Sequence, residues 1–386
     1  MNLLQKIFNK ISRNSFCTLH NPNVNAKDKA MATYIYFIYD ASSLFNSALN
    51  FNLLHPAQWE MPIYGIAAWE VGVSLIFSEH NGFNHGLLSK SINKNVIEGH
   101  KVIVMGQGKV FSKLIADKND SALYILLATE SHPKILKKAE NLAVKDALTY
   151  NLNIKKIRQF KGFISDDMVE IADKILVIGS NFSAKTFPKN KVFKVINPTC
   201  FRYNRLINQD KFNKKNTILW VGSSGMALKG FHWLYLMAKE IKHFNFIAIG
   251  VNFDELKDKF RDLPNLICFE FIDFESEEGT KILNETRFGF LPYYCEGMTT
   301  AGLSLLGFGI PLLVSKEAGL DDLVPKEYVI EELNYKFVHS AILSCLSDDH
   351  MHIKQKNGIE KVNTFISSTL RFKDDIKGAI EYVSNN

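Results

Sequence analysis

Two loops carry the side chains best suited to chemistry, and the first is rich in glycine and serine. It reads GSSGMALKG over residues 222–230, directly after the apolar run TILWVG. Gly222 lets the backbone approach a ligand, and the hydroxyl groups of Ser223 and Ser224 can donate hydrogen bonds. Lys229 adds a positive charge at the start of a helix, so the loop could bind a diphosphate. The loop does not match the P-loop motif G-x-x-x-x-G-K-[ST]. An alternative interpretation is a plain turn between a strand and a helix, without a function.

The second loop combines a carboxylate with backbone N–H groups. It reads YYCEGMTTAG over residues 293–302 and follows the apolar run RFGFLPY. Glu296, at the end of a predicted buried strand, can accept hydrogen bonds from sugar hydroxyls, while N–H groups at the start of the next helix attract negative charge. A polyhydroxylated ligand bearing phosphate fits both, although Glu296 could also be a helix-start acid without a function. The residues that offer these N–H groups are Gly297, Met298, Thr299 and Thr300.

The second half of the chain alternates between strands and helices that would position these loops. The predicted strands are apolar on both faces, which is typical of parallel strands covered by helices on each side. Alternation with helical segments indicates βαβ units, so this half is predicted to be a Rossmann-like domain with a doubly wound sheet. Because ligands bind beyond the carboxyl ends of parallel strands, both loops fall where a site is expected. The predicted strands cover residues 217–222, 244–250, 265–271, 287–293 and 310–315.

The first half alternates less regularly but indicates a second domain of the same kind. Its clearest helix is expected over residues 133–150, where apolar residues recur on one face. Residues 34–40 and 71–77 both resemble strands, and the sequence does not decide which is central. A polar, asparagine-rich run around residues 197–216 predicts a linker. Further strands are expected over 101–105, 121–129, 174–179 and 192–196, and the apolar helix face consists of Ile135, Leu136, Ala139, Leu142, Ala143 and Leu148.

Composition narrows the class of protein. The chain of 386 residues is 46% hydrophobic and 22% charged, as expected for globular domains with full cores. The sequence contains no uninterrupted apolar run of about 18 residues, so no membrane-spanning helix is predicted. The five cysteines form no C-x-x-C pair, which favours reduced thiols in the cytoplasm and argues against a zinc site. Only seven of the 46 basic residues are arginine, and no basic stripe alternates with aromatic residues, so nucleic acid is not an expected partner.

The net charge of +6 is unevenly distributed. Residues 1–200 carry 24 Lys and Arg against 15 Asp and Glu, whereas residues 201–386 carry 22 against 25. A basic half beside a slightly acidic half suggests two domains that face different partners, and a chance spread of surface lysines is the alternative. The basic surface could face a phospholipid surface or an acidic glycolipid, or it could simply be a solvated face. Residues 2–13 have the pattern of a short amphipathic helix, which suits either a membrane surface or packing on the chain's own domain. The basic residues considered are Lys134, Lys137, Lys138, Lys155, Lys156 and Arg158.

Taken together, these segments resemble the family-4 type of retaining glycosyltransferases, whose fold is called GT-B. GSSGMALKG is similar to the family's glycine loop followed by Lys-Gly, and FLPYYCEGMTTAGLSLLGFGIPLLVS is similar to its E-G-x-x signature with a later G-x-P. EIADKILVIGSNFSAKTF and KVINP resemble the segment before the family's domain boundary. LLATESHPKILKKAENLAVKDALTYN looks like a segment of members that make cell-surface polysaccharides. The resemblance covers most of residues 121–320 and is faint before residue 80.

The resemblance implies a fold class and a division of the chain. We expect an α/β protein of GT-B type, with two Rossmann-like doubly wound domains facing a cleft and a helical C-terminus. Helices over roughly 336–347, 350–366 and 371–384 and hinges near 197–205 and 368–372 are expected, and hinge closure would exclude water from the cleft. The expected parts are a basic amphipathic helix and linker over residues 1–30, an acceptor domain over 31–200, a nucleotide-sugar domain over 201–370 and a helix crossing back to the first domain over 371–386.

The resemblance also implies roles for individual residues. Lys229 would neutralise the diphosphate of the donor as its glycosidic bond breaks, and Glu296 would hold hydroxyl groups of the donor sugar. His132 would be the histidine of the first domain near the transferred sugar, with His80 and His85 as competitors. The remaining donor contacts would come from Gly222, Ser223 and Ser224, from Phe271, Ile272 and Asp273 beside the base, and from Gly297, Met298, Thr299, Thr300 and Ser304.

Two positions depart from the family pattern. The second glutamate of the family's E-x(7)-E pair is Ser304 here, and a serine binds a ribose hydroxyl more weakly than a carboxylate does. The arginine that usually follows the first glycine of the loop is Ser223, which leaves fewer positive charges for the diphosphate. These changes leave open an altered donor, a weakened enzyme or a protein that binds without turnover.

The leading hypothesis is a metal-independent glycosyltransferase of the hexosyltransferase type that needs no cofactor. It would move a sugar, with its configuration retained, from a nucleotide-diphosphate sugar to a glycan or lipid-linked acceptor in bacterial cell-surface polysaccharide, lipopolysaccharide or capsule synthesis. The alternative is a non-catalytic GT-B-fold binding or scaffold protein with a degenerate donor site, and an epimerase or phosphorylase on this fold is a third interpretation. The expected location is the cytoplasm, with peripheral contact with the inner face of the cell membrane as an option.

Overall fold

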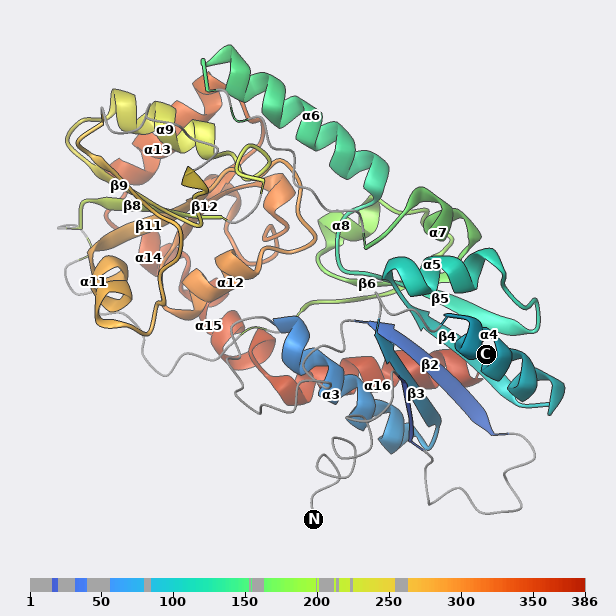
Figure 1. Cartoon of the computed structure of the whole chain (residues 1–386). Helices are drawn as coiled ribbons and strands as arrows, with labels where there is room; N and C mark the ends of the chain where they lie inside the picture. The colour runs from blue at the N-terminus through green and yellow to red at the C-terminus, as the bar shows by residue number, and fades with distance from the viewer. Residues whose placement is uncertain are drawn as a thin grey trace.

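The chain forms two sheets of mostly parallel strands, each covered by helices on both faces (Figure 1). A computed structural model describes residues 16–19, 32–39, 56–79, 85–152, 163–198, 215–222, 225–253 and 263–385, together with residues 154, 200 and 212. The predicted helix over residues 2–13 lies outside this described part. The expectation of two Rossmann-like doubly wound domains is confirmed by the arrangement of the strands in both sheets.

The first sheet has the strand order β1-β3-β2-β4-β5-β6-β7. All its pairings are parallel except that of β1 with β3, so β1 is an antiparallel strand at one edge. Of the two early apolar runs, β2 is the more central strand, which settles the choice between them. Strand β1 falls within residues 1–30, which were expected to contain a helix and a linker. The strands are β1 (Phe16–Leu19), β2 (Thr33–Tyr39), β3 (Ser74–Glu79), β4 (Lys101–Gly106), β5 (Ala122–Ala128), β6 (Lys174–Ile178) and β7 (Val192–Ile196).

Helices on the two faces of the first sheet bury two separate cores. One core contains Tyr64 of α3 and lies beneath α3 and the last helix of the chain, whereas the other contains Phe111 of α5 and Met168 of α7. Strand residues with alternating side chains contribute to each core, which is why the strands read as apolar throughout. The helices of this half are α3 (Pro56–Val71), α4 (His85–Ile97), α5 (Gly108–Ala116), α6 (Pro133–Thr149), α7 (Asp166–Ile171) and α8 (Asn181–Lys185).

Helix α6 departs from the predicted packing. Ala143 and Ala147 are buried, but Ile135, Leu142 and Leu148 are 38%, 51% and 51% exposed. The buried pair belongs to the core of the second domain, so α6 reaches from the end of β5 across to that domain (Figure 1). A helix that crosses between two domains packs on each through only part of its length, and its remaining apolar residues face outward.

The second sheet is entirely parallel, with the strand order β10-β9-β8-β11-β12-β13. The chain moves outward from β8 to β10 and then continues with β11 on the other side of β8. The point between β8 and β11 is therefore the topological switch point, where ligands bind in sheets of this kind. The strands are β8 (Thr217–Val221), β9 (Asn245–Ile249), β10 (Leu266–Phe269), β11 (Thr286–Leu291), β12 (Leu312–Ser315) and β13 (Val329–Ile330).

The helix predicted over residues 350–366 is divided into three pieces. The first break falls at Gln355, whose side-chain amide donates to the carbonyl of Leu312 and accepts from its N–H. This tertiary contact with β12 outweighs the local preference for one continuous helix. Helices of this half are α9 (Phe231–Glu240), α11 (Glu277–Glu285), α12 (Thr300–Gly307), α13 (Tyr335–Ser347), α14 (Met351–Lys354), α15 (Lys356–Lys361), the π-helical turn η6 (Val362–Ile366) and the 3₁₀ turns η4 (Lys316–Ala318) and η5 (Lys326–Tyr328).

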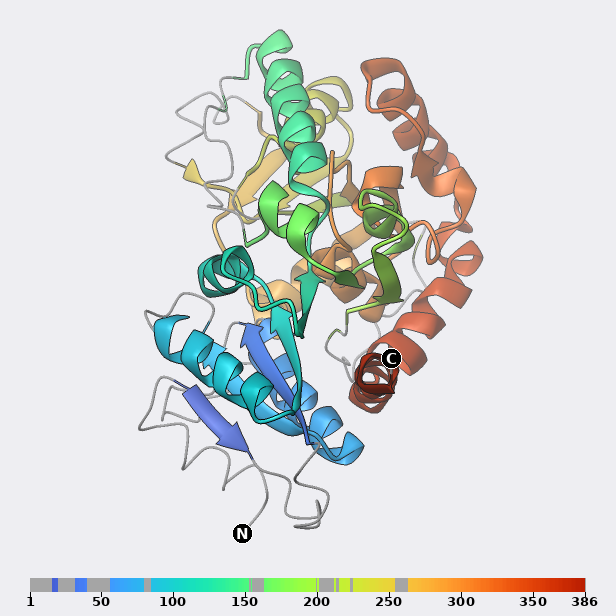
Figure 2. The same ribbon diagram turned by 90° about the vertical axis from the view of Figure 1, so that its right-hand side faces the viewer.

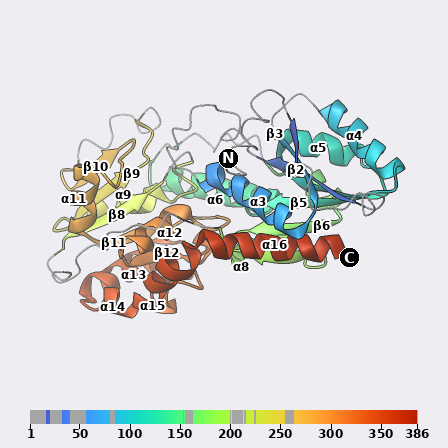
Figure 3. The ribbon, with the colours of Figure 1, turned by 90° about the horizontal axis from the view of Figure 1, so that it is seen from below.

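The last helix, α16 (Thr369–Asn385), leaves the second domain and lies beside α3 under the first sheet (Figure 3). The helices from α13 to α16 follow one another down one side of the molecule (Figure 2). Five side chains of α16 are buried in the core of the first domain. They are Phe372, Ile376, Ala379, Ile380 and Val383.

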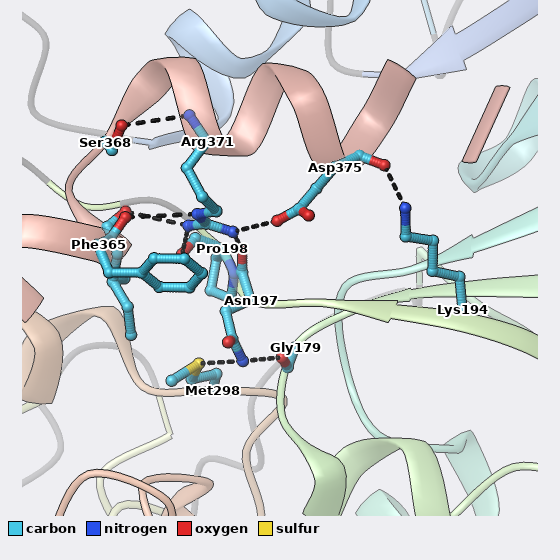
Figure 4. Close-up of polar contacts among 10 residues, drawn as sticks. Gly179, Lys194, Asn197, Pro198, Met298, Phe365, Ser368, Arg371 and Asp375 are labelled. Atoms are coloured by element: carbon cyan, nitrogen blue, oxygen red, sulfur yellow. Dashed lines mark hydrogen bonds and ion pairs between the residues drawn. The ribbon is translucent and has the colours of Figure 1, made fainter. Parts of the chain in front are cut away.

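Arg371 joins the two chain segments that pass between the domains (Figure 4). Its guanidinium donates to the carbonyl of Asn197 (3.0 Å) on one segment and to the carbonyl of Ile366 (3.1 Å) on the other. It also pairs with Asp375 of α16 at 2.9 Å. The Asn197 side chain in turn donates to the sulfur of Met298 at 3.6 Å. The crossing is thus a pinned junction with a direct contact to the loop after β11.

Candidate functional site

The two loops singled out in the sequence meet at the switch point of the second sheet. The first follows β8 and the second follows β11, the two adjacent strands at which the strand order reverses. Lys229 lies just before α9, and its backbone carbonyl accepts a hydrogen bond from the indole of Trp220 at 2.8 Å. Its N–H donates to the carbonyl of Gly225 at 3.0 Å. Because Trp220 is fully buried in β8, the loop holds Lys229 in a fixed position.

Lys229 and Glu296 form an ion pair between the two loops. Their side chains are only 9% and 15% exposed, so both charges are largely removed from water. The ammonium of Lys229 also lies 4.4 Å from the centre of the Tyr293 ring, which attracts a cation through its π face. The sequence placed Glu296 at the end of the strand. This was wrong, because β11 ends at Leu291 and Pro292 cannot continue the ladder.

The backbone N–H groups after Glu296 divide into engaged and unengaged ones. Glu296 donates its N–H to the carbonyl of Glu317 at 2.9 Å, and Thr299 donates to that of Ala318 at 3.2 Å. The Thr299 hydroxyl caps α12 by accepting from the N–H of Gly302 at 3.3 Å. In the described part of the chain, the N–H groups of Gly297 and Met298 donate to no protein acceptor. Two adjacent backbone donors beside a lysine can bind phosphate or sugar oxygens.

The first domain holds this loop from behind. The hydroxyl of Ser131 donates to the carbonyl of Glu296 at 3.1 Å. Ser180 donates twice to the carbonyl of Gly297, from its hydroxyl at 2.7 Å and from its N–H at 3.0 Å. Ser131 and Ser180 are 2% and 1% exposed, so the contact excludes water.

A second polar contact between the domains is centred on Tyr294. Its hydroxyl donates to Asp146 of α6 at 2.7 Å and accepts from the indole of Trp233 at 3.0 Å. The ring of His232 lies 2.9 Å from the same hydroxyl. Burial lowers the pKa of His232 to about 3, so its imidazole is neutral. The cluster joins α6 to α9 beside the Lys229 loop.

His132 caps α6, one residue after Ser131. Its Nδ1 atom accepts the N–H of Lys134 at 3.2 Å and lies 3.7 Å from Asp166. Burial lowers the pKa of His132, and the Asp166 carboxylate partly opposes this effect. His85 begins α4, and His80 lies outside the described residues. The role near a transferred sugar that the resemblance gives to His132 stays a prediction.

The remaining predicted donor contacts are spread around the same edge of the sheet. Phe271, Ile272 and Asp273 follow β10, where Phe271 is 66% exposed and Asp273 holds a turn by accepting from the N–H of Glu275 at 2.9 Å. Gly222 directly follows β8 and donates its N–H to the carbonyl of Ile249 at 2.8 Å. The other predicted contacts are Thr300 and Ser304, both in α12, and Ser223 and Ser224, which lie outside the described residues.

Sequence reasoning missed several residues around the ion pair. Tyr293 stacks under Lys229, and its hydroxyl donates to the carbonyl of Val221. Burial raises the pKa of the Glu317 carboxyl and raises the pKa of the Cys295 thiol to about 11. Tyr293 and Cys295 could have been found from their place in the loop after β11, close to Glu296 in the sequence. Ser131 and Ser180 gave no signal, because their partners are more than 100 residues away in the chain.

The described ranges show neither a metal-binding cluster nor a membrane-spanning helix. No group of three or more His, Cys, Asp and Glu side chains there could hold a metal ion. Among the helices described, none is both long and apolar enough to cross a membrane.

Solved structures share the architecture of the chain, although no protein-family model and no curated protein matches it. Sucrose-phosphate synthase from Thermosynechococcus elongatus has a TM-score of 0.55 at 13% identity, over 92% of this chain and 98% of its own. Anabaena Alr3699/HepE in complex with UDP and glucose has a TM-score of 0.52 at 12% identity, over 92% and 100%. A mutant of S. aureus TarM in complex with Fondaparinux, alpha-GlcNAc-glycerol and UDP has a TM-score of 0.50 at 14% identity, over 78% and 59%. With two doubly wound sheets and an α16 that returns to the first, the chain has the GT-B fold of glycosyltransferases.

Proposed function

We propose that the chain transfers a sugar from a nucleotide-diphosphate sugar to an acceptor hydroxyl. The observation that carries this proposal is the buried pair of Lys229 and Glu296 at the switch point, beside the unengaged N–H groups of Gly297 and Met298 in the described part of the chain. The GT-B fold supports it, as does the presence of UDP in the structures of HepE and TarM.

Each group has a distinct task in this reaction. The bond between the anomeric carbon and the diphosphate oxygen breaks, and Lys229 together with the N–H groups stabilises the negative charge left on the diphosphate. Glu296 accepts hydrogen bonds from sugar hydroxyls and holds the sugar in place. The acceptor hydroxyl attacks on the face from which the diphosphate leaves, so the configuration is retained, and the hydroxyl proton passes to the departing diphosphate oxygen. The lysine supplies the positive charge at the leaving group, and we propose that no metal is needed.

The acceptor is a glycan or a lipid-linked sugar of bacterial cell-surface polysaccharide, lipopolysaccharide or capsule. Support comes from the outward face of α6, where lysines and large apolar residues are exposed together. Such a face can lie on an anionic bilayer, so the protein works as a cytoplasmic enzyme in peripheral contact with the membrane. Cosedimentation of the protein with phosphatidylglycerol vesicles tests this membrane contact. Charge reversal at two of these lysines should weaken the cosedimentation. The residues are Lys134, Ile135, Lys137, Lys138, Leu142, Lys145 and Leu148.

The donor site is tested by thermal unfolding with a panel of nucleoside diphosphates and nucleotide sugars. A ligand at about 100 times its dissociation constant adds roughly 2.7 kcal/mol to stability. The test variant is Lys229→Ala, and the matched control is Lys215→Ala, because Lys215 is similarly buried, at 8% exposed, but lies before β8, at the opposite end of the strand. We expect one nucleotide to stabilise the wild type and the Lys215 variant but not the Lys229 variant.

Turnover separates transfer from binding alone. Consumption of the stabilising nucleotide sugar, with the product anomer read by NMR, should be abolished in Glu296→Ala. If a nucleotide binds but is never consumed, the scaffold interpretation replaces the enzyme. If no nucleotide stabilises the wild type at millimolar concentration, the donor site itself is refuted.

A further inference from the structure

Two serines of the first domain hydrogen-bond the backbone of the loop after β11. Ser131 binds the carbonyl of Glu296, and Ser180 binds the carbonyl of Gly297 with two donors. Two consecutive peptide groups of the second domain are therefore bound by residues of the other domain. Among the described residues, neither serine makes a hydrogen bond to the side chain of Lys229 or Glu296, and both bind the backbone of the loop. Ser131 also hydrogen-bonds the thiol of Cys295 in the same loop.

The planarity of the peptide group gives these contacts a consequence. In a trans peptide, the N–H of one residue points opposite to the carbonyl of the residue before it. Binding the carbonyl of Glu296 therefore orients the N–H of Gly297 away from Ser131. Binding the carbonyl of Gly297 orients the N–H of Met298 away from Ser180. These are the two N–H groups without a protein acceptor in the described ranges.

The surrounding backbone is fitted to this contact. A Cβ atom at Gly297 would lie 2.6 Å from the carbonyl oxygen of Thr129. A Cβ atom at Gly319 would lie 2.7 Å from the hydroxyl oxygen of Ser180 and 2.9 Å from the carbonyl oxygen of Gly297, and Gly319 has a φ of +72°. Glycine at both positions lets the segments around Thr129, Ser180 and Gly319 approach the loop closely. A residue with a side chain at either position would disturb this contact.

We propose that Ser131 and Ser180 are positioning residues that set the donor-binding amides of Gly297 and Met298 from the opposite domain. This inference rests on the proposed function and adds its conformational requirement. The amides are aimed at the donor only when the two domains are in contact, so the second domain alone binds a nucleotide without the amide geometry needed for bond breaking. The two serines thereby couple closure of the domains to stabilisation of the leaving diphosphate.

The test compares serines that cap helices in the same domain. Ser180 and Ser165 each accept the N–H of the third residue of a short helix at 3.3 Å, but Ser165 caps α7 and makes no hydrogen bond to the loop after β11 in the structure described. Ser165→Ala therefore controls for the loss of a cap. Ser180→Ala removes the cap and one bond to Gly297, and Ser131→Ala removes the bond to Glu296 without removing a cap.

Kinetics on the stabilising nucleotide sugar give the first readout. We expect Ser180→Ala and Ser131→Ala to lower kcat about tenfold, the equivalent of about 1.4 kcal/mol, with little change in KM. Ser165→Ala should leave both constants near those of the wild type. Values of kcat and KM in the two test variants equal to those of Ser165→Ala would overturn the proposal.

Hydrogen exchange without any ligand gives the second readout. The N–H of Thr299 is bonded to Ala318 in the same domain, so its exchange reports on how firmly the loop is held. Exchange over residues 294–303 should be about fivefold faster in both test variants and unchanged in Ser165→Ala. Unchanged exchange in the test variants refutes positioning whatever the protein binds. If the wild type neither binds nor consumes any nucleotide sugar, the proposed function fails. The exchange result alone then decides whether the serines hold the loop.

Discussion

Replacing Glu296 by glutamine and Lys229 by methionine, singly and together, measures how strongly the central ion pair is coupled. Both side chains are more than four-fifths buried, so each single change leaves a charge without its main partner in a poorly hydrated place. Breaking a buried pair in this way typically costs about 3–5 kcal/mol. The double variant removes both charges and leaves none stranded.

The structure makes the two single variants unequal. In Glu296→Gln, the Lys229 ammonium keeps its contact with the Tyr293 ring, and cation–π contacts of desolvated groups are worth about 2 kcal/mol. We therefore expect that variant to lose about 2–3 kcal/mol of unfolding free energy. Lys229→Met leaves the carboxylate without such help and should lose about 3–5 kcal/mol. The double variant should lose about 1–2 kcal/mol, which corresponds to a coupling of about 5 kcal/mol.

Urea unfolding of the four proteins, followed by far-ultraviolet circular dichroism, supplies these free energies. Binding of the stabilising nucleoside diphosphate supplies an independent check. Glu296→Gln should bind the diphosphate at least as tightly as the wild type, since Lys229 no longer has a competing carboxylate, whereas Lys229→Met should bind it at least about tenfold more weakly. If the two single-variant losses add up to the loss of the double variant within about 0.5 kcal/mol, the coupling is refuted.

Three further changes have expected outcomes. Arg371→Ala removes the hydrogen bonds that pin the domain crossing and should cost about 2–3 kcal/mol in urea unfolding, with Arg371→Lys intermediate; an unchanged midpoint would contradict the junction. Tyr294→Phe removes the hydroxyl shared by Asp146 and α9 and should cost about 2–4 kcal/mol, measured in the same way. Because burial lowers the pKa of His232 to about 3, the unfolded chain binds a proton that the folded chain does not between about pH 6.5 and pH 3. Stability should fall by up to about 1.4 kcal/mol per pH unit on acidification through this window, and His232→Gln should lose this part of the slope.

The sequence allowed prediction of what depends on strand order and local pattern. Apolar runs bounded by polar loops located most strands, and parallel strands place all their carboxyl ends at one edge. The proximity of Lys229 and Glu296 followed from that rule, although 66 residues of chain lie between them. The sequence alone was enough to predict a lysine and a carboxylate on two loops at the same edge of the sheet.

What the sequence could not give depends on contacts between distant segments. The apolar stripe of α6 indicated a buried face, but periodicity cannot tell that Ala143 packs on the second domain while Leu142 faces outward. The break at Gln355 arises from a pairing with Leu312, which no local propensity encodes. The serines behind the loop belong to the same class, because a serine before a short helix usually only caps it.

The return of α16 to the first domain affects the order in which the chain can finish folding. The core beneath the first sheet contains Tyr64 from α3 and Phe372 from α16, whose rings lie 5.8 Å apart. While the chain is being made, that core lacks its cover until the residues after Phe372 leave the ribosome, by which time the second sheet has already emerged. Until then, one apolar face of the first sheet stays partly uncovered. A chimaera that exchanges the first domain has to exchange α16 with it.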